Sequence, residues 1–226
     1  MTRIASFGFR LLLLAALCAS GRAGAQTTPG HPAVSPWEKE IGAFEARDKT
    51  NMPPKGEILF VGSSSIRFWN SLARDFPGKT VINRGFGGSQ IADSTALADR
   101  IIVPYAPREI VFYAGDNDLA AGKSADRVFA DFQAFLARIH ERLPKARVAF
   151  ISIKPCPLRW KLKDKVAEVN RRIAAIRDDR LIYIDVSTSM LGADGKPRPE
   201  LFRPDGLHPN EKCYQLWAKL ITPYLD

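Results

Sequence analysis

The chain has 226 residues, of which 46% are hydrophobic, a size and composition that suit one α/β domain with a substantial core. Its 33 basic and 24 acidic residues give a formal net charge of +9, which favours contact with anionic surfaces. The basic residues form no long run and no stripe interleaved with aromatic residues, so the sequence speaks against nucleic-acid binding.

The first 25 residues have the pattern of an export signal. Arg3 and Arg10 precede the apolar run 11–19, and Ala23-Gly24-Ala25 offers the small residues of a cleavage site. The run is shorter than the roughly 20 apolar residues that span a membrane, and it lacks the polar face of a core helix. We therefore predict a signal peptide over residues 1–25, no membrane span, and export of the mature protein to the periplasm or the medium.

A short leader and one helix come next. Residues 26–34, which include Pro29 and Gly30, are expected to form a flexible leader. Ser35 and Pro36 supply an N-cap and a first-turn proline for a helix that extends to about residue 49. The folded domain is thus expected to cover residues 35–226.

Beyond Pro53-Pro54, short apolar runs alternate with amphipathic stretches. The runs are rich in β-branched and aromatic residues, which is typical of strands covered on both faces. The clearest of the helical stretches follows the N-cap Ser124. We predict strands at 58–61, 80–82, 110–113, 148–153 and 181–186, and helices at 125–143, 160–177 and 209–224.

This alternation predicts a parallel sheet with right-handed crossover connections. The expected fold class is α/β: a single-domain, flavodoxin-like three-layer sandwich with a five-stranded parallel sheet. No internal repeat, low-complexity tract or linker to a second domain is visible. Functional groups of such folds gather at the carboxyl ends of the strands, and four segments of the chain fit that position.

The first segment, Gly62-Ser63-Ser64-Ser65, follows the first predicted strand. A serine there would lie at a helix N-terminus, where free amides and the helix dipole favour developing negative charge. Simple N-capping by serine is the alternative. A phosphate-binding loop is excluded because no Gly-Lys-Ser/Thr follows.

The second segment runs from Asn83 to Gly88 and contains three glycines. Glycines allow close approach of the backbone and can aim an amide at an anion; a tight turn is the alternative. A dinucleotide fingerprint is rejected because its third small residue would fall at Gln90.

The third segment, Asp116-Asn117-Asp118, follows the third predicted strand and forms either a site or the cap of the next helix. Asp116 and Asp118 are conceivable metal ligands. No histidine or further carboxylate nearby completes a ligand set, so we expect no metal.

The fourth segment contains Asp205 and His208, followed by Pro209. A carboxylate three residues before a histidine can accept the ring Nδ1–H, which leaves Nε2 free as a base. An aspartate turn with a surface histidine is the alternative. The other two histidines are His31 in the leader and His140 near the end of a helix, where a structural role is expected.

Taken in order, the four segments resemble the sequence blocks of the SGNH (GDSL-like) hydrolase superfamily, in its branch of exported esterases. The resemblance extends from about residue 58 to the last helix. The family's Gly-Asp-Ser is here Gly62-Ser63-Ser64, a Gly-Ser-Ser form of the nucleophile block. The other three blocks are matched by Asn83 to Gly88, by Gly115 to Asp118, and by Asp205 with His208.

The resemblance implies a serine acylhydrolase that needs no metal and no organic cofactor. It implies Ser64 as the nucleophile, His208 as its base and Asp205 as the partner of the imidazole. It implies an oxyanion hole made by the amides of Ser64 and Gly88 and by the side chain of Asn117. A shift of one residue in the first block would make Ser65 the nucleophile instead.

The loops expected around the site favour a small ester or an acylated carbohydrate as the substrate. No long apolar insertion that could form a lipase groove separates the four segments. Arg84 and Trp160 are candidate substrate-binding residues, since a guanidinium can bind a polar group and an indole can stack on a ring; Trp160 could equally pack on the helix that it begins. We expect hydrolysis of short, acetyl-type esters. The alternatives are a periplasmic lysophospholipase or thioesterase, an O-acyltransferase with the same site, and a non-catalytic envelope-binding protein.

Export would leave Cys156 and Cys213 in a compartment where disulfides persist. Both are expected near the active-site end of the sheet, so a disulfide between them is one hypothesis. Two separate thiols are the alternative, because a bridge needs Cα atoms within roughly 7 Å. Lipidation of Cys18 is disfavoured by Leu17, which stands where a small residue would be expected.

Overall fold

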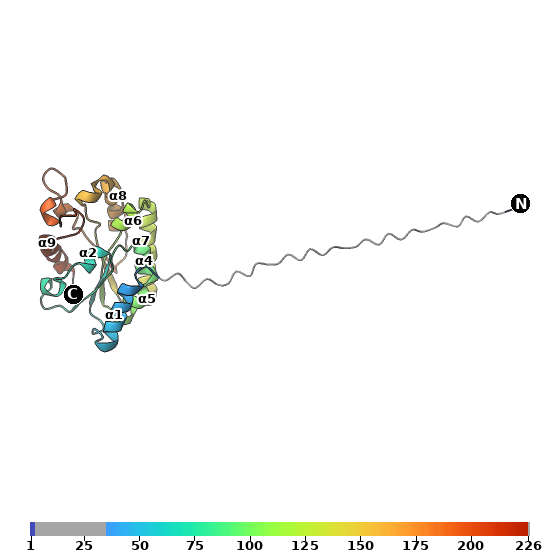
Figure 1. Cartoon of the computed structure of the whole chain (residues 1–226), viewed down its shortest axis with the longest axis horizontal. Coiled ribbons are helices and arrows are strands. Elements are labelled where there is room, and N and C mark those ends of the chain that lie inside the picture. Colours follow the sequence, from blue (N-terminus) through green and yellow to red (C-terminus); the bar gives the residue numbers. More distant parts are fainter. Residues whose placement is uncertain (3–34, 226) are drawn as a thin grey trace. The chain divides into compact units, whose positions relative to one another are not determined.

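Five strands form one sheet in the order β2-β1-β3-β4-β5, and every neighbouring pair is parallel. The computed structural model describes residues 1–2 and 35–225 (Figure 1). Apart from Met1 and Thr2, the predicted signal peptide and leader lie outside these residues. The strands are β1 (Ile58–Gly62), β2 (Val81–Gly85), β3 (Glu109–Tyr113), β4 (Arg147–Ile151) and β5 (Leu181–Ile184). The predicted parallel sheet is therefore confirmed.

The described part of the chain also contains nine α-helices and five short 3-10 helices. The α-helices are α1 (Glu38–Thr50), α2 (Ser64–Arg67), α3 (Leu72–Asp75), α4 (Ile91–Ala96), α5 (Ala98–Ile101), α6 (Asp116–Ala120), α7 (Ala125–Arg142), α8 (Lys163–Ala174) and α9 (Glu211–Ile221). The 3-10 helices are η1 (Val103–Tyr105), η2 (Pro157–Leu162), η3 (Thr188–Met190), η4 (Pro199–Leu201) and η5 (Thr222–Tyr224).

Helices cover both faces of the sheet, which gives the predicted three layers (Figure 1). Side chains alternate along each strand: in β3, Ile110 and Phe112 point into one core, and Val111 and Tyr113 point into the other. The first core is closed by α1, α4, α5, α7 and α8, and the second by α2, α3 and α9. Among the described residues, no helix is long and apolar enough to cross a membrane.

The helix ends follow local chemistry, and the predicted helices 160–177 and 209–224 are shorter than expected, at Lys163–Ala174 and Glu211–Ile221. Ser124 caps α7 as expected, since its Oγ accepts the N–H of Arg127 at 3.2 Å. The predicted helix 160–177 begins only at Lys163, because Trp160 to Leu162 belong to the 3-10 segment η2, in which Arg159 has a non-helical φ of −114°. The helix after Ser64 ends at Arg67, and Trp69 turns into the core to pack on Phe60.

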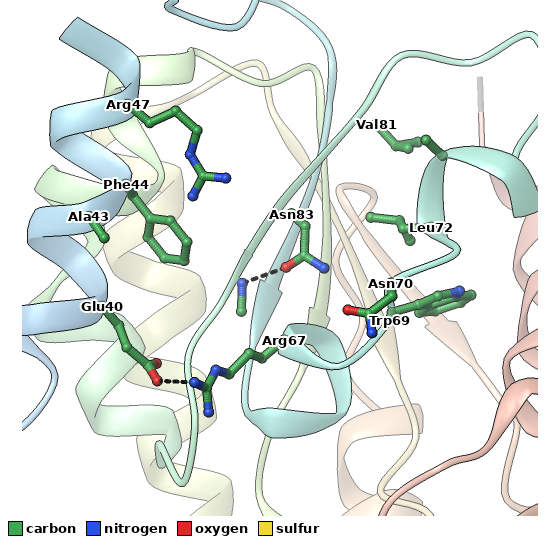
Figure 2. A pocket seen from close by; sticks show the side chains of 12 residues that line it. Glu40, Ala43, Phe44, Arg47, Arg67, Trp69, Asn70, Leu72, Val81 and Asn83 are labelled. Carbon is green, nitrogen blue, oxygen red and sulfur yellow. Dashed lines mark hydrogen bonds and ion pairs between the residues drawn. The ribbon is translucent and has the colours of Figure 1, made fainter. Parts of the chain in front are cut away.

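A pocket of about 470 Å³ separates α1 from the edge strand β2 and the α2–α3 segment. Arg67 of α2 reaches across it to Glu40 of α1, at 2.9 Å (Figure 2). Ile41 of α1 is buried in the same core as Ile82 of the edge strand β2.

Candidate active site

Ser64 is the first residue of α2, directly after the tight turn that ends β1. The turn requires a glycine at position 62. Gly62 has a φ of +136°, and a Cβ there would lie 1.9 Å from the carbonyl oxygen of Tyr113. The N–H of Ser63 donates to the same oxygen at 2.9 Å. This close packing of β1 on β3 presents Ser64 at the carboxyl edge of the sheet, next to the point where the strand order reverses.

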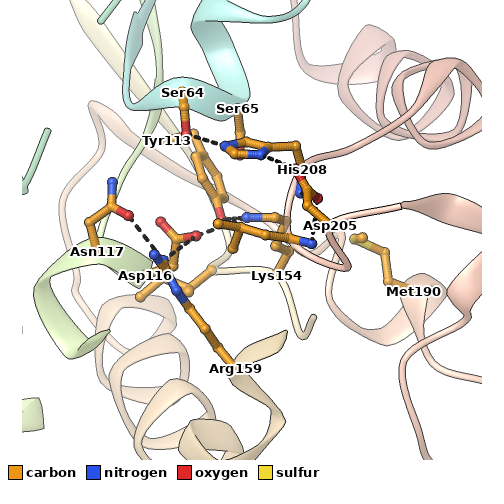
Figure 3. A network of polar contacts seen from close by, with 12 residues as sticks. Ser64, Ser65, Tyr113, Asp116, Asn117, Lys154, Arg159, Met190, Asp205 and His208 are labelled. Atoms are coloured by element: carbon orange, nitrogen blue, oxygen red, sulfur yellow. Dashed lines mark hydrogen bonds and ion pairs between the residues drawn. The ribbon is translucent and has the colours of Figure 1, made fainter. Parts of the chain in front are cut away.

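The side chains of Ser64, His208 and Asp205 form a continuous hydrogen-bonded chain (Figure 3). The Nε2 atom of His208 lies 3.0 Å from Oγ of Ser64, and its Nδ1 lies 2.7 Å from Oδ2 of Asp205. The other oxygen, Oδ1, accepts the backbone N–H groups of Leu207 and His208, both at 2.9 Å. These two backbone hydrogen bonds hold the Asp205 carboxylate in place independently of its contact with the imidazole.

The electrostatics of this turn favour an ionised Asp205. Partial burial alone would raise the pKa of Asp205, but the hydrogen bonds from the His208 ring and from the amides of His208 and Leu207 lower the pKa to about 2. The ring of Phe68 meets the imidazole edge-on, with 5.0 Å between centroids. An anionic partner on one nitrogen and an aromatic wall on one side hold the imidazole toward Ser64.

The neighbouring serines have different surroundings. Ser63 and Ser65 are each 1% exposed. The hydroxyl of Ser63 is buried without a hydrogen-bond partner among the described residues, and the carbonyl of Ser65 accepts the hydroxyl of Tyr214 at 3.0 Å. Of the three serines in this block, Ser64 is the one whose hydroxyl contacts His208.

The three predicted oxyanion donors lie in α2, in the turn at Gly88 and in α6. In the described part of the chain, the backbone N–H groups of Ser64 and Gly88 pair with no protein acceptor. The Nδ2 of Asn117, in α6, donates to the carbonyl of Ser89 at 3.0 Å, and its Oδ1 accepts from Nη1 of Arg159 at 3.0 Å. Since an amide nitrogen carries two hydrogens, Asn117 keeps one donor for a ligand.

A buried charged network lies beside Asn117 (Figure 3). Lys154, only 2% exposed, donates from Nζ to Tyr113 Oη and to Asp116 Oδ2, both at 2.9 Å. Arg159 approaches the same Asp116 oxygen at 3.2 Å. Burial alone would raise the pKa of Asp116 and lower that of Lys154, but their mutual attraction lowers the Asp116 pKa and raises the Lys154 pKa. Both groups are therefore charged.

The structure does not support Arg84 as a substrate-binding residue. Its guanidinium is buried, 2.6 Å from both Tyr105 Oη and Asp48 Oδ1, and it lies over the ring of Phe44. Arg84 thus fastens β2 to α1 and η1. Trp160 lines a pocket of about 210 Å³ with Pro155, Ser187 and Leu191. A role of Trp160 in substrate binding stays a prediction.

Asp118, Cys156 and Cys213 are buried in the protein interior. Asp118 is fully buried and pairs with Lys123 at 2.8 Å, and its Oδ2 accepts the N–H of Ile91 at 3.2 Å. Among the described residues, no group of three or more His, Cys, Asp or Glu side chains is placed to hold a metal ion. Cys156 and Cys213 are free, buried thiols, so the structure contains no disulfide between them.

A Ser–His–Asp chain at the carboxyl edge of a doubly wound sheet is an arrangement found in serine acyl hydrolases. The model of the GDSL-like Lipase/Acylhydrolase family matches residues 60–216, which is more than half of the chain. The chain therefore belongs to this family, and it is a carboxylic ester hydrolase.

Individual relatives agree with this assignment. The chain is 26% identical over 176 residues to the platelet-activating factor acetylhydrolase IB subunit alpha1 of Bos taurus, covering 70% of this chain and 69% of the relative. A Streptococcus pneumoniae protein described as a platelet activating factor has the same fold, with a TM-score of 0.72, 20% identity, and coverage of 84% of this chain and 92% of its own. An acetyl-xylooligosaccharide esterase from Geobacillus is similar in fold as well, with a TM-score of 0.61, 13% identity, and coverage of 75% and 94%.

Proposed function

We propose that the chain hydrolyses short acyl esters, acetyl esters foremost, with Ser64 as the nucleophile. The observation that carries the proposal is the hydrogen-bonded chain from Ser64 Oγ through His208 to the ionised Asp205. Aligned in this way, the imidazole can accept the serine proton while the carboxylate compensates the charge that develops on the ring.

The proposed reaction has two steps. In the first, Ser64 Oγ attacks the ester carbonyl carbon, its proton passes to His208 Nε2, and the oxyanion accepts hydrogen bonds from the amides of Ser64 and Gly88 and from Asn117 Nδ2. His208 then returns the proton to the departing alcohol oxygen, which leaves an acyl ester on Ser64. In the second step, His208 removes a proton from water and the water oxygen attacks the acyl ester. The bond between the acyl carbon and Ser64 Oγ then breaks, His208 returns the proton to Oγ, and the carboxylic acid leaves.

The acetyl part of the proposal is supported by the relatives. Both the Bos taurus subunit and the Geobacillus esterase carry the acetyl group in their names. The Geobacillus protein also acts on an acetylated carbohydrate, which makes a sugar hydroxyl the proposed alcohol part. Trp160 is proposed to offer a stacking face at the 210 Å³ pocket.

A chain-length series tests the substrate class. We expect kcat/KM for p-nitrophenyl esters to be highest for acetate and butyrate and to fall for octanoate and palmitate. Acetate release from acetylated xylan is then measured. A maximum at octanoate or longer would overturn the short-acyl proposal, and rapid acetate ester hydrolysis without release from acetylated glycans would remove its carbohydrate part.

A further inference from the structure

Helix α1 contacts the loop that carries Gly88, although α1 precedes the family match at residues 60–216. The indole Nε1 of Trp37, the residue before α1, donates to the carbonyl of Gly87 at 2.5 Å. The carboxylate of Glu40 accepts the N–H of the same Gly87 at 2.9 Å. Two side chains from one helical segment thus hold both backbone groups of a single loop residue.

Because the peptide unit is planar, the hydrogen bonds to Gly87 also restrict the orientation of the Gly88 N–H. The described part of the chain contains no cis peptide bond, so the Gly87 carbonyl and the Gly88 N–H lie in one plane and point in opposite directions. A donor fixed on the carbonyl oxygen therefore fixes the direction of the N–H. Gly88 itself has a φ of +72°, a conformation from which a free glycine loop would readily rotate away.

Glu40 connects the same loop to the serine helix. Its second oxygen forms an ion pair at 2.9 Å with Arg67, which lies in α2 together with Ser64 (Figure 2). The Arg67 side chain covers Gly87, since a Cβ at that position would lie 2.9 Å from Nη1. The helix α1, the Gly87–Gly88 peptide and the serine helix are therefore linked by hydrogen bonds and an ion pair.

We propose that Trp37 and Glu40 are positioning residues, which hold the Gly87–Gly88 peptide so that the Gly88 N–H faces the oxyanion. The inference rests on the proposed function, because it takes Gly88 as one of the oxyanion donors. Neither side chain touches the reacting atoms. Their effect is expected on the stabilisation of the oxyanion, and not on the binding of the uncharged ester.

We call the hydrogen bonds from Trp37 and Glu40 to Gly87 the clamp. Other contacts hold α1 on the domain independently of the clamp. Arg100 of α5 pairs with Glu38 at 2.8 Å and with Glu45 at 2.7 Å, and Asp48 pairs with Arg84 at 2.6 Å. The Trp37 ring also packs edge-on against Phe86, with 5.6 Å between centroids. A Trp37→Phe variant keeps an aromatic ring at this place and loses the N–H donor, so it separates the hydrogen bond from the packing.

The test compares Trp37→Phe, Glu40→Met and Glu40→Gln with the parent enzyme on p-nitrophenyl acetate. Glu45→Gln is the matched control, because it removes a carboxylate of α1 that does not touch the loop. Ser64→Ala is measured in parallel. Besides kcat and KM, the experiment records the melting temperature and the Ki of a trifluoromethyl ketone. The serine oxygen adds to the carbonyl of this inhibitor, the serine proton passes to His208, and an oxyanion forms in the hole.

We expect Trp37→Phe and Glu40→Met to lower kcat and raise the Ki by the same factor, on the order of tenfold or more, with KM changed less than twofold. Glu40→Gln keeps an acceptor for the Gly87 N–H and should retain most of the parent kcat. Glu45→Gln should match the parent enzyme. Unchanged kcat and Ki in both Trp37→Phe and Glu40→Met overturn the clamp, and so does a rise in KM alone. Activity in Ser64→Ala equal to that of the parent would instead overturn the proposed function, and the clamp with it.

Discussion

Ser64 and His208 are 144 positions apart in the chain, and their contact depends on how each is fixed locally. Ser64 is fixed by the glycine turn at Gly62, where β1 packs too closely on β3 for any side chain. His208 is fixed by the Asp205 turn and by α9, which begins at the Asn210 cap and packs into the core through Trp217. Each side chain is thus held by backbone geometry, which is the preorganisation that acyl transfer requires.

Asn117→Ala tests the side-chain donor of the proposed oxyanion hole. We expect kcat on p-nitrophenyl acetate to fall by about 10²–10³, equivalent to ~2.7–4 kcal/mol of barrier, because one donor to the oxyanion is lost. KM should change little. Steady-state kinetics provide the measurement, with the exposed Asn51→Ala as the control. An unchanged kcat would exclude Asn117 from the oxyanion hole.

The elements around the site are joined by the ion pair of Lys154, which follows β4, with Asp116, the first residue of α6. Buried charge pairs contribute little net stability when intact, but the loss of one partner leaves an uncompensated charge. The pair also connects to Asn117 through Arg159, so the two strand ends and the proposed oxyanion donor form one unit.

Lys154→Met should destabilise the fold, because among the described residues Asp116 then keeps only Arg159 as a cationic partner. We expect the free energy of unfolding, measured in urea, to fall by about 3 kcal/mol. The double variant Lys154→Met/Asp116→Asn should recover much of the loss, because it removes both charges. Equal stability of parent and single variant would show that the pair is not needed.

The two cysteines, one after β4 and one in α9, should be unreactive in the native protein. Burial raises the pKa of the Cys156 thiol and raises that of Cys213 to about 12, so little thiolate exists at pH 8. We expect Ellman's reagent to react slowly with the folded protein and to titrate both thiols after unfolding without reductant. A thiol count of zero for this pair in the unfolded, unreduced protein would demonstrate a disulfide.

Much of the molecule's architecture is predictable because it depends on long patterns. All the strands except β2 consist largely of one apolar run, and α7 and α9 are long enough for their periodic apolar faces to be recognised. The short helices α3, α4 and α5 have at most six residues each, too few to show a helical period. Their positions are set by packing on the sheet, which no local pattern in the sequence encodes.

The site was predictable in part, from short motifs and not from long patterns. Ser64, His208 and Asp205, the proposed nucleophile, base and carboxylate, belong to short blocks with a recognisable order, and the structure brings these three side chains together. Arg84 was expected in a loop after the second strand, but it lies within β2, where its side chain contacts Asp48 of α1. Trp37 and Glu40 were missed because their contacts to Gly87 span 50 and 47 positions and follow no motif.

Export of the whole molecule stays a prediction, since residues 3–34 lie outside the described structure. We expect the full-length chain, expressed in a bacterial host, to yield a mature protein that begins at Gln26 and is recovered outside the cytoplasm. Intact-mass spectrometry of the product checks the cleavage site. A product that retains residues 1–25 in the cytoplasmic fraction would contradict the prediction.

The central claim is that Ser64 carries the acyl group, and active-site labelling tests it most directly. A fluorophosphonate should modify the protein once, and peptide mass spectrometry should locate the adduct on Ser64. Ser64→Ala should lose both labelling and hydrolysis of p-nitrophenyl acetate, whereas Ser63→Ala and Ser65→Ala should keep both. An adduct on Ser65, or a Ser64→Ala variant that hydrolyses the ester as fast as the parent enzyme, would contradict the claim.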